Sequence, residues 1–279
     1  MNPTGPQHIA HGLSQGWHLV VTLNPVLIDT TLRTLRLAVE ATAIAAIVGV
    51  PLGCALGLGR SRSSRALRGV ANGLVRVPPV AVGLFVVILL TPASPWGGGP
   101  LADLGWYSSS EAAYLAQTLL AIPIMIALTA TAVGSVSPVL LDQARAYGAS
   151  GVRRGIFAIR EARRRMIATV LVTMGVTITA IGALVIANAP LTARAAASSG
   201  SYAPQPPTLA LGAWQAFTGA GGQGGSDVTT GVQATNLQNP TQALGVAYAT
   251  VLMGLFLLLA AALTWIQRRR SQWIPGLLS

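Results

Sequence analysis

Five long apolar runs constrain the fold of this chain more than any other feature. They cover residues 31–58, 70–90, 112–133, 166–189 and 243–266. Each run is at least as long as the roughly 20 residues that a helix needs to cross a bilayer. In lipid the backbone must satisfy its own hydrogen bonds, so each run is expected to be helical. The sequence therefore predicts an all-α polytopic membrane protein with about five transmembrane helices.

Prolines interrupt three of these runs. The pair Pro78–Pro79 lies near the start of the second run, where its missing N–H groups should kink or break the helix. Pro51 and Pro123 lie inside the first and third runs. Both should bend their helices for the same reason.

The composition agrees with a membrane protein and excludes a nucleic-acid-binding one. Of the 279 residues, 52% are hydrophobic and only 9% are charged, whereas soluble domains carry about 25% charged residues. A soluble protein with several buried helices is the alternative, but it does not need apolar runs of this length. The net charge of +11 would suit nucleic acid. The arginines cluster at the ends of the apolar runs, however, where membrane topology explains them.

The positions of the arginines predict the topology. All 18 basic residues are arginine. Five lie in residues 60–76, seven in residues 140–165 and three in residues 268–270. These segments lie on one side if the five helices alternate, and positive residues stay in the cytoplasm. We therefore expect a multi-pass protein of the cytoplasmic (inner) membrane of a prokaryote, with its N-terminus outside and its C-terminus in the cytoplasm.

The segments outside the apolar runs define the expected organisation of the chain. Residues 1–29 form an outer or interfacial segment, residues 30–270 form the transmembrane domain, and residues 271–279 form a cytoplasmic tail. Within the domain, residues 190–242 are rich in Ala, Gly, Ser, Pro, Gln and Thr, which indicates a flexible outer loop. Alternatively, its larger side chains contact the membrane surface or a partner. These are Leu209, Leu211, Trp214 and Phe217.

The first apolar run carries three glycines at four-residue spacing. Gly49, Gly53 and Gly57 should form a smooth stripe that allows a second helix to approach closely. Cys54 lies in the same run and has no metal-ligand residues beside it in the sequence. It is expected to be a small buried residue rather than a reactive one.

The outer end of the first run carries three charged residues on one helix face, namely Arg33, Arg36 and Glu40. One interpretation is that the arginines extend to the interface and pair with a local acid. The alternative is an outer vestibule that attracts anions.

The sequence carries no motif of a catalytic site. Without a lysine, it cannot contain the GxxxxGK[ST] phosphate-binding loop. The histidines, His8, His11 and His18, all precede the first run, with no acid or cysteine among them. We expect no enzyme active site, no cofactor and no metal. If the protein uses ATP, another chain supplies the nucleotide site.

Between the third and fourth runs lies the polar segment "LLDQARAYGASGVRRGIFAIREARRR", residues 140–165. Its pattern predicts two short helices, with Gly148 ending the first. Such an element can lie at the membrane surface and present one face to a soluble partner. The alternative is a basic loop that holds anionic lipid. The expected apolar sides consist of Leu140, Leu141, Ala144 and Tyr147, and of Ile156, Phe157, Ile159 and Ala162.

Within this segment, "DQARAYGAS" resembles the "EAA" loop of permease subunits of ABC importers. Asp142 stands for the usual glutamate, Ala144 for the last alanine and Gly148 for the glycine, whereas Gln143 departs from the middle alanine. The usual downstream "LP" is replaced by "REAR" at Arg160–Arg163. This variant is similar to permeases of the tungstate-importer type. So are "GVPLG", "VPPVAVGLFV" and "AQTLLAIPIMIALT", and the likeness covers roughly residues 15–190.

The resemblance implies a function and a set of partners. Residues 138–165 would be the coupling loop, docking on an ABC ATPase subunit through Asp142, Gln143, Ala144, Gly148, Arg160 and Glu161. A second copy of the chain would complete the pathway, and an extracytoplasmic solute-binding protein would deliver a small oxyanion, tungstate first. A different small solute is the alternative within transport. A non-transport membrane scaffold that retains the fold is the alternative outside it.

One departure concerns the substrate. Permeases of this type carry an arginine and a glutamate after the coupling loop, in a pattern like "GRAxxExGA". Here the segment reads "GVTITAIGA", with Val176 and Ala180 in those places. The remaining polar groups are Thr173, Thr177 and Thr179. They are candidates for lining the pathway as neutral donors, although threonine hydroxyls also bond to the carbonyl one turn earlier.

Overall fold

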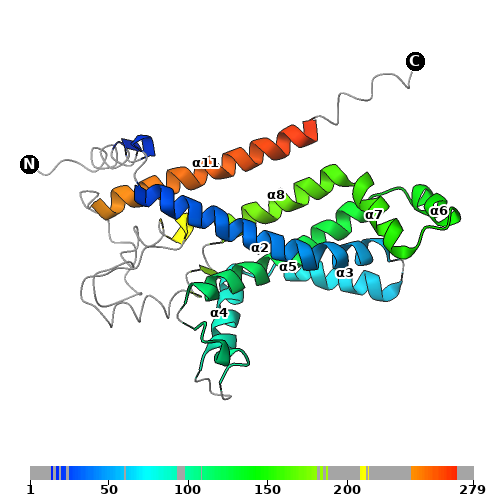
Figure 1. Cartoon of the computed structure of the whole chain (residues 1–279), viewed down its shortest axis with the longest axis horizontal. Helices are drawn as coiled ribbons and strands as arrows, with labels where there is room; N and C mark the ends of the chain where they lie inside the picture. The colour runs from blue at the N-terminus through cyan, green and yellow to red at the C-terminus, as the bar shows by residue number, and fades with distance from the viewer. Residues whose placement is uncertain are drawn as a thin grey trace, which may run out of the picture. The chain divides into compact units, whose positions relative to one another are not determined.

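The computed structural model describes residues 25–59, 61–92, 98–107, 109–180 and 240–268, and short pieces elsewhere. This part of the chain is helical and contains no strand, which confirms the predicted all-α fold class. The helices are α2 (Pro25–Leu58), α3 (Arg62–Leu74), α4 (Pro79–Leu90), η1 (Ala102–Leu104), α5 (Ser110–Gly134), α6 (Pro138–Ala146), α7 (Gly151–Glu161), α8 (Arg163–Thr179) and α11 (Pro240–Arg268) (Figure 1).

Three of the described helices are long and apolar enough to cross a membrane. They are α2, residues Glu111–Gly134 of α5 and residues Gly245–Ile266 of α11. They correspond to the first, third and fifth predicted runs. The pair α3 and α4 passes the same test as one broken span. The fourth predicted run, residues 166–189, begins in α8, and most of its last part lies outside the described residues.

The second predicted run, residues 70–90, does not form one continuous helix. Its first residues belong to α3, and α4 begins only at Pro79, with a bend of 96° between the two helices. The break itself was expected, because Pro78 and Pro79 cannot donate backbone hydrogen bonds. With 12 residues, α4 is about 18 Å long, well short of the hydrocarbon core of about 30 Å.

The basic segment at residues 60–76, expected to be a connection, contains the helix α3. The Ser61 hydroxyl caps this helix by accepting a 3.1 Å hydrogen bond from the Ser64 N–H. Its large apolar side chains, Leu67, Val70 and Leu74, are about half exposed. Their spacing of three and four residues places them on one side of the helix. The sequence of α3 is therefore amphipathic. This pattern was missed because its arginines indicated a polar connection.

The chain divides into two compact units. The first consists of residues 1–38, 78–117 and 178–256, and the second of residues 39–77, 118–177 and 257–279. Helices α2, α5, α8 and α11 each contribute residues to both units. The second unit contains α3, α6 and α7 in full, so it holds the element that resembles a coupling loop.

In the first unit, part of the predicted outer loop is packed into a core. Leu209 and Leu211 are buried, and the Leu209 N–H donates a 2.8 Å hydrogen bond to the Thr34 hydroxyl of α2. These two leucines therefore pack inside the chain, in contrast to the alternative that they contact the membrane surface or a partner. Trp214 and Phe217 lie outside the described residues, as do most of residues 190–242.

The charged face at the start of α2 forms an ion pair within the same helix. An Arg33 guanidinium nitrogen lies 2.8 Å from a carboxylate oxygen of Asp29, and both side chains are about half exposed. Exposed pairs of this kind stabilise a helix by about 0.3–0.5 kcal/mol. The acid one turn before Arg33 is thus an ion partner of this arginine.

In the second unit, the glycine stripe of α2 packs directly on α5. A Cβ atom added to Gly53 would lie 2.7 Å from the Ile126 carbonyl oxygen, and one added to Gly57 would lie 2.8 Å from the Ala130 carbonyl oxygen. Gly49 makes the same kind of approach to α5 one turn earlier. Since only glycine fits at these separations, the predicted close-packing role of the stripe is confirmed.

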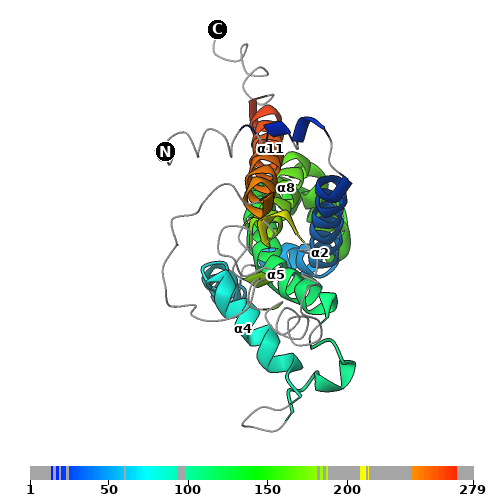
Figure 2. The same cartoon turned by 90° about the vertical axis from the view of Figure 1, so that its left-hand side faces the viewer.

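Within the second unit, α8 lies beside the last part of α11, residues 257–268 (Figures 1 and 2). Within the second unit, a Cβ atom added to Gly175 of α8 would lie 3.8 Å from a methyl carbon of Leu259 of α11. This is ordinary van der Waals separation, so the contact does not require glycine in the way that the α2–α5 contact does.

Candidate docking surface and substrate path

Helix α6 ends in a tight turn at Gly148. The Ala149 N–H donates to the Ala144 carbonyl at 3.0 Å, and the Gly148 N–H donates to the Arg145 carbonyl at 2.9 Å. This pair of bonds is a Schellman motif, which requires a left-handed residue after the helix. Gly148 supplies it with φ of +79°. The predicted helix end at this glycine is confirmed.

Helix α7 begins immediately after this turn. The Ser150 hydroxyl accepts a hydrogen bond of 3.4 Å from the Arg153 N–H, and its carbonyl accepts one of 2.9 Å from the Arg154 N–H. Only residues 147–150 therefore separate the two helices. Because both flanking ends are capped, the turn fixes the direction of α7 relative to α6.

The inner face of α6 and α7 packs on the membrane helices of the second unit. Small residues allow this contact: Gly155 and Ala158 are buried, and a Cβ atom added to Gly155 would lie 3.2 Å from the Cys54 sulfur of α2. This explains why Cys54 is buried, as the sequence predicted. The shared core consists of Cys54, Ala132, Val133, Val136, Leu141, Ala158, Ala162 and Met166.

The outer face of the same two helices exposes large apolar side chains. Tyr147 is 91% exposed and Val152 is 76% exposed, and Val139, Leu140, Ile156 and Phe157 are also exposed. Of the expected apolar sides, only Leu141 and Ala162 are buried. Most of the large members of these apolar sides therefore face outward, because α7 approaches Cys54 of α2 closely at Gly155. An apolar patch of this kind is typical of a protein–protein interaction site.

The residues predicted to couple to an ATPase all lie on this element. Asp142 and Gln143 are exposed on α6, and Ala144 is half-buried. Arg160 and Glu161 are exposed in the last turn of α7. Here the cation Arg160 is favourably placed relative to the helix dipole. We name this surface, formed by the exposed side chains of residues 138–161, the docking surface.

The docking surface is also basic. Arg145, Arg153 and Arg160 are exposed on it. Arg154 is half-buried, and its Nε atom has no hydrogen-bond partner among the described residues. A buried donor without an acceptor destabilises a structure by about 1–3 kcal/mol. The surface is therefore suited to a partner that brings both apolar and acidic groups.

The three candidate pathway threonines differ in their surroundings. Thr173 and Thr177 are buried, whereas Thr179 is exposed. The Thr173 hydroxyl donates to the Thr169 carbonyl at 2.9 Å, and the Thr177 hydroxyl donates to the Met174 carbonyl at 2.8 Å. These bonds to the preceding turn are the alternative role noted above. Each hydroxyl would have to turn away from its carbonyl to donate to a solute.

Gln117 of α5 is a polar residue of the membrane helices that sequence reasoning missed. Its side chain is 0% exposed, and neither amide atom has a hydrogen-bond partner among the described residues. Leaving a buried amide unpaired is unfavourable, so such a group is a candidate for a functional contact. In the sequence, Gln117 was marked only as an amide within an apolar run. Its burial in the structure is what distinguishes it from a residue that faces lipid.

Metal-ligating residues do not gather in the part of the chain that the structure describes. No group of three His, Cys, Asp or Glu side chains lies close enough there to hold an ion. His8 and His11 lie outside the described residues.

Two curated proteins share significant sequence similarity with the chain, and no protein-family model matches it. A probable anion ABC transporter permease protein of Haloferax volcanii is 29% identical over 160 residues, covering 57% of this chain and 67% of that protein. The tungstate uptake system permease protein TupB of Peptoclostridium acidaminophilum is 29% identical over 180 residues, covering 64% and 77%. The resemblance to ABC permeases of the anion and tungstate type is confirmed by these matches.

Proposed function

We propose that this chain is the membrane-spanning permease subunit of an ABC importer that moves a small oxyanion, most specifically tungstate. The observation that carries the proposal is the docking surface. A capped helix–Gly148–helix element lies between membrane helices and exposes apolar and basic side chains. The names of the two similar proteins support both the transport role and the anionic class of solute.

The proposal requires two soluble partners. The chain has no lysine for a phosphate-binding loop, so a separate subunit binds the nucleotide. That subunit docks on the docking surface, residues 138–161. An outer binding protein delivers the solute, and a second copy of the chain completes the path. Closure of the ATP-loaded subunits pushes α6 and α7, whose inner faces share a core with α2, α5 and α8. That shared core passes the movement to the helices and alternates access between the two sides.

Uptake by the assembled transporter tests this function. The chain, the proposed ATPase subunit and the proposed binding protein are reconstituted together in vesicles, and ATP-dependent entry of radiolabelled tungstate is measured. We expect uptake that excess tungstate or molybdate suppresses and that sulfate at the same concentration suppresses less. Uptake of a different solute in place of tungstate would contradict the assignment of tungstate as the substrate, but not the transport role. An ATP hydrolysis rate of the ATPase that is the same with and without this chain would contradict the transport role.

The same uptake assay tests the proposed path. Gln117→Leu removes an unpaired amide donor, so we expect a decrease of about tenfold in uptake, with membrane abundance unchanged or higher. Thr173→Val and Thr177→Val should have smaller effects, because both hydroxyls already donate to backbone carbonyls. Normal uptake in all three variants would show that these residues do not line the path. Reduced abundance of Gln117→Leu would indicate a structural role instead.

The proposed topology places the docking surface and the C-terminus in the cytoplasm and residues 190–242 outside. In a Cys54→Ser background, a single cysteine at Ser150 should react with an impermeant maleimide only after the membrane is opened. A single cysteine at Ser201 should react in intact cells. Labelling of position 150 from outside would overturn the topology.

A further inference from the structure

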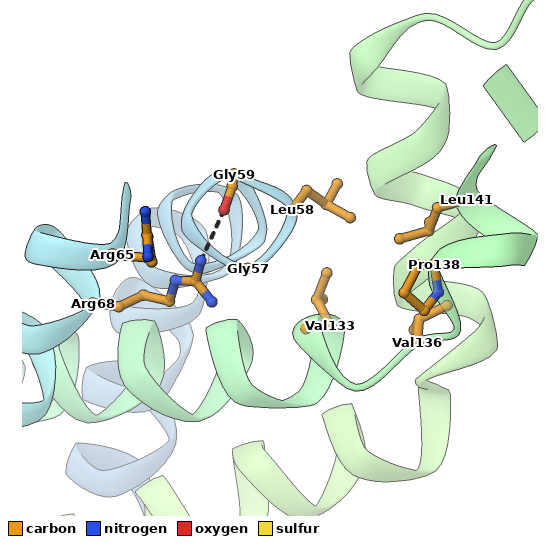
Figure 3. Close-up of a pocket in the computed structure, with 10 residues that line it drawn as sticks. Gly57, Leu58, Gly59, Arg65, Arg68, Val133, Val136, Pro138 and Leu141 are labelled. Atoms are coloured by element: carbon orange, nitrogen blue, oxygen red, sulfur yellow. Dashed lines mark hydrogen bonds between the residues drawn. The ribbon is translucent and has the colours of Figure 1, made fainter. Parts of the chain in front are cut away.

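A cavity of about 370 Å³ opens where α2 ends, between α3, the end of α5 and the start of α6 (Figure 3). All of these segments belong to the second unit. One wall is polar and carries Arg65, Arg68 and the backbone of Gly59. The opposite wall is apolar and carries Val136, Pro138 and Leu141. The cavity therefore has a cationic wall on one side and an apolar wall on the other.

The arginines of the polar wall carry positive charge that no acidic side chain neutralises among the described residues. The Arg68 guanidinium donates to the Gly59 carbonyl at 2.8 Å, which stabilises the C-terminal end of α2, and its Nε donates to the Ser64 carbonyl at 3.4 Å. Both acceptors are neutral, and no ion pair of either arginine occurs among the described residues. A guanidinium has five donors in a planar fork that matches phosphate. The wall is thus suited to an anion with several oxygens.

The position of α3 favours a membrane source for that anion. Leu67, Val70 and Leu74 are about half exposed along one side of this helix, and the chain enters and leaves it through the apolar helices α2 and α4. An amphipathic helix in this setting lies at the membrane interface with its apolar side in the acyl region. Its arginines are then at the level of lipid phosphates.

We propose that this cavity binds the headgroup of an anionic phospholipid. The phosphate lies against Arg65 and Arg68, and the glycerol carbons contact the wall formed by Val136, Pro138 and Leu141. The apolar wall is what distinguishes this occupant from free phosphate, which would leave that wall without a partner. A headgroup in this place contacts both α3 and the first turn of α6. Lipid at the interface therefore helps to fix the helix that begins the docking surface.

Retention of lipid by the purified full-length chain tests the proposal without ATPase or substrate, so the result does not depend on the proposed transport function. The protein is delipidated in mild detergent, incubated with phosphatidylglycerol or phosphatidylcholine, and examined by native mass spectrometry. Wild-type protein should retain phosphatidylglycerol preferentially. Arg65→Gln together with Arg68→Gln should weaken that retention by more than about tenfold.

Two further variants separate the cavity from general surface attraction. Arg62→Gln removes an exposed arginine of the same helix that does not line the cavity, so it should retain the lipid. Gly134→Leu fills the cavity without touching the arginines; an added Cβ there meets only the Gly57 carbonyl oxygen, at 3.6 Å. This variant should lose the lipid while remaining monodisperse. It keeps the proposal testable if the double arginine variant fails to fold.

Three results would overturn the proposal. Equal loss of lipid in Arg62→Gln and in the double variant would mean unspecific attraction to a basic helix. Full retention in Gly134→Leu would place the lipid elsewhere. Displacement of the lipid by inorganic phosphate, but not by chloride at equal ionic strength, would make free phosphate the occupant.

Discussion

Replacing Gly53 by leucine is expected to remove most of the folded protein from the membrane. A Cβ atom at this position would lie 2.7 Å from the Ile126 carbonyl oxygen and 2.7 Å from the Thr129 Cβ. The first of these is a backbone atom, which cannot rotate away. Overpacking a tight contact destabilises a protein by about 1–3 kcal/mol or more. We expect a decrease of at least about tenfold in monodisperse protein after extraction, measured by fluorescence-detected size exclusion.

Gly254→Leu is the matched control for this prediction. Gly254 lies in the membrane helix α11, and nothing within 4 Å meets its Cβ position. The same substitution there should leave the amount of protein unchanged or slightly raise it, because leucine favours helix more than glycine does. Equal losses in both variants would mean that added bulk in any membrane helix is harmful. The α2–α5 contact would then not be the cause.

The sequence predicted the contacts that depend on glycine better than it predicted the lengths of helices. The stripe of Gly49, Gly53 and Gly57 has one simple consequence, a close approach of backbones, and the structure contains it. Pro78–Pro79 also has one simple consequence, the loss of two donors. The loss of donors does not determine how far the chain turns at the break, which is 96° in the structure.

The sequence left open which partner the apolar side chains of residues 140–165 contact. Ile156, Ile159 and Ala162 recur at helical spacing, and such a period does not distinguish a core from a docking surface. The structure distinguishes them because α7 approaches α2 at Gly155 and leaves no room for large side chains. Gln117 was missed for a related reason. A single amide has no period, and only its burial without a partner marks it as a candidate.

We expect Gly148→Val to prevent stable docking of the proposed ATPase subunit while leaving insertion into the membrane intact. Gly148 adopts φ of +79°, a conformation that costs roughly 1–2 kcal/mol for an ordinary residue and is an outlier for a β-branched one. Nothing lies within 4 Å of its Cβ position, so the strain falls on the backbone alone. The turn would have to open, which breaks the bonds to the Ala144 and Arg145 carbonyls and redirects α7.

The amount of ATPase that co-purifies with the tagged chain measures this effect, and we expect a decrease of about tenfold or more, in line with the strain. Gly148→Asn is the matched variant, because asparagine tolerates left-handed backbone; it should dock nearly as well as wild type. Gly151→Ala changes a nearby glycine that has no positive φ and should also dock normally. Normal docking of Gly148→Val would show that the turn does not orient α7 for the partner. Equal losses in Gly148→Asn would show that the ATPase contacts the glycine itself, since an asparagine side chain would then obstruct the contact without straining the turn.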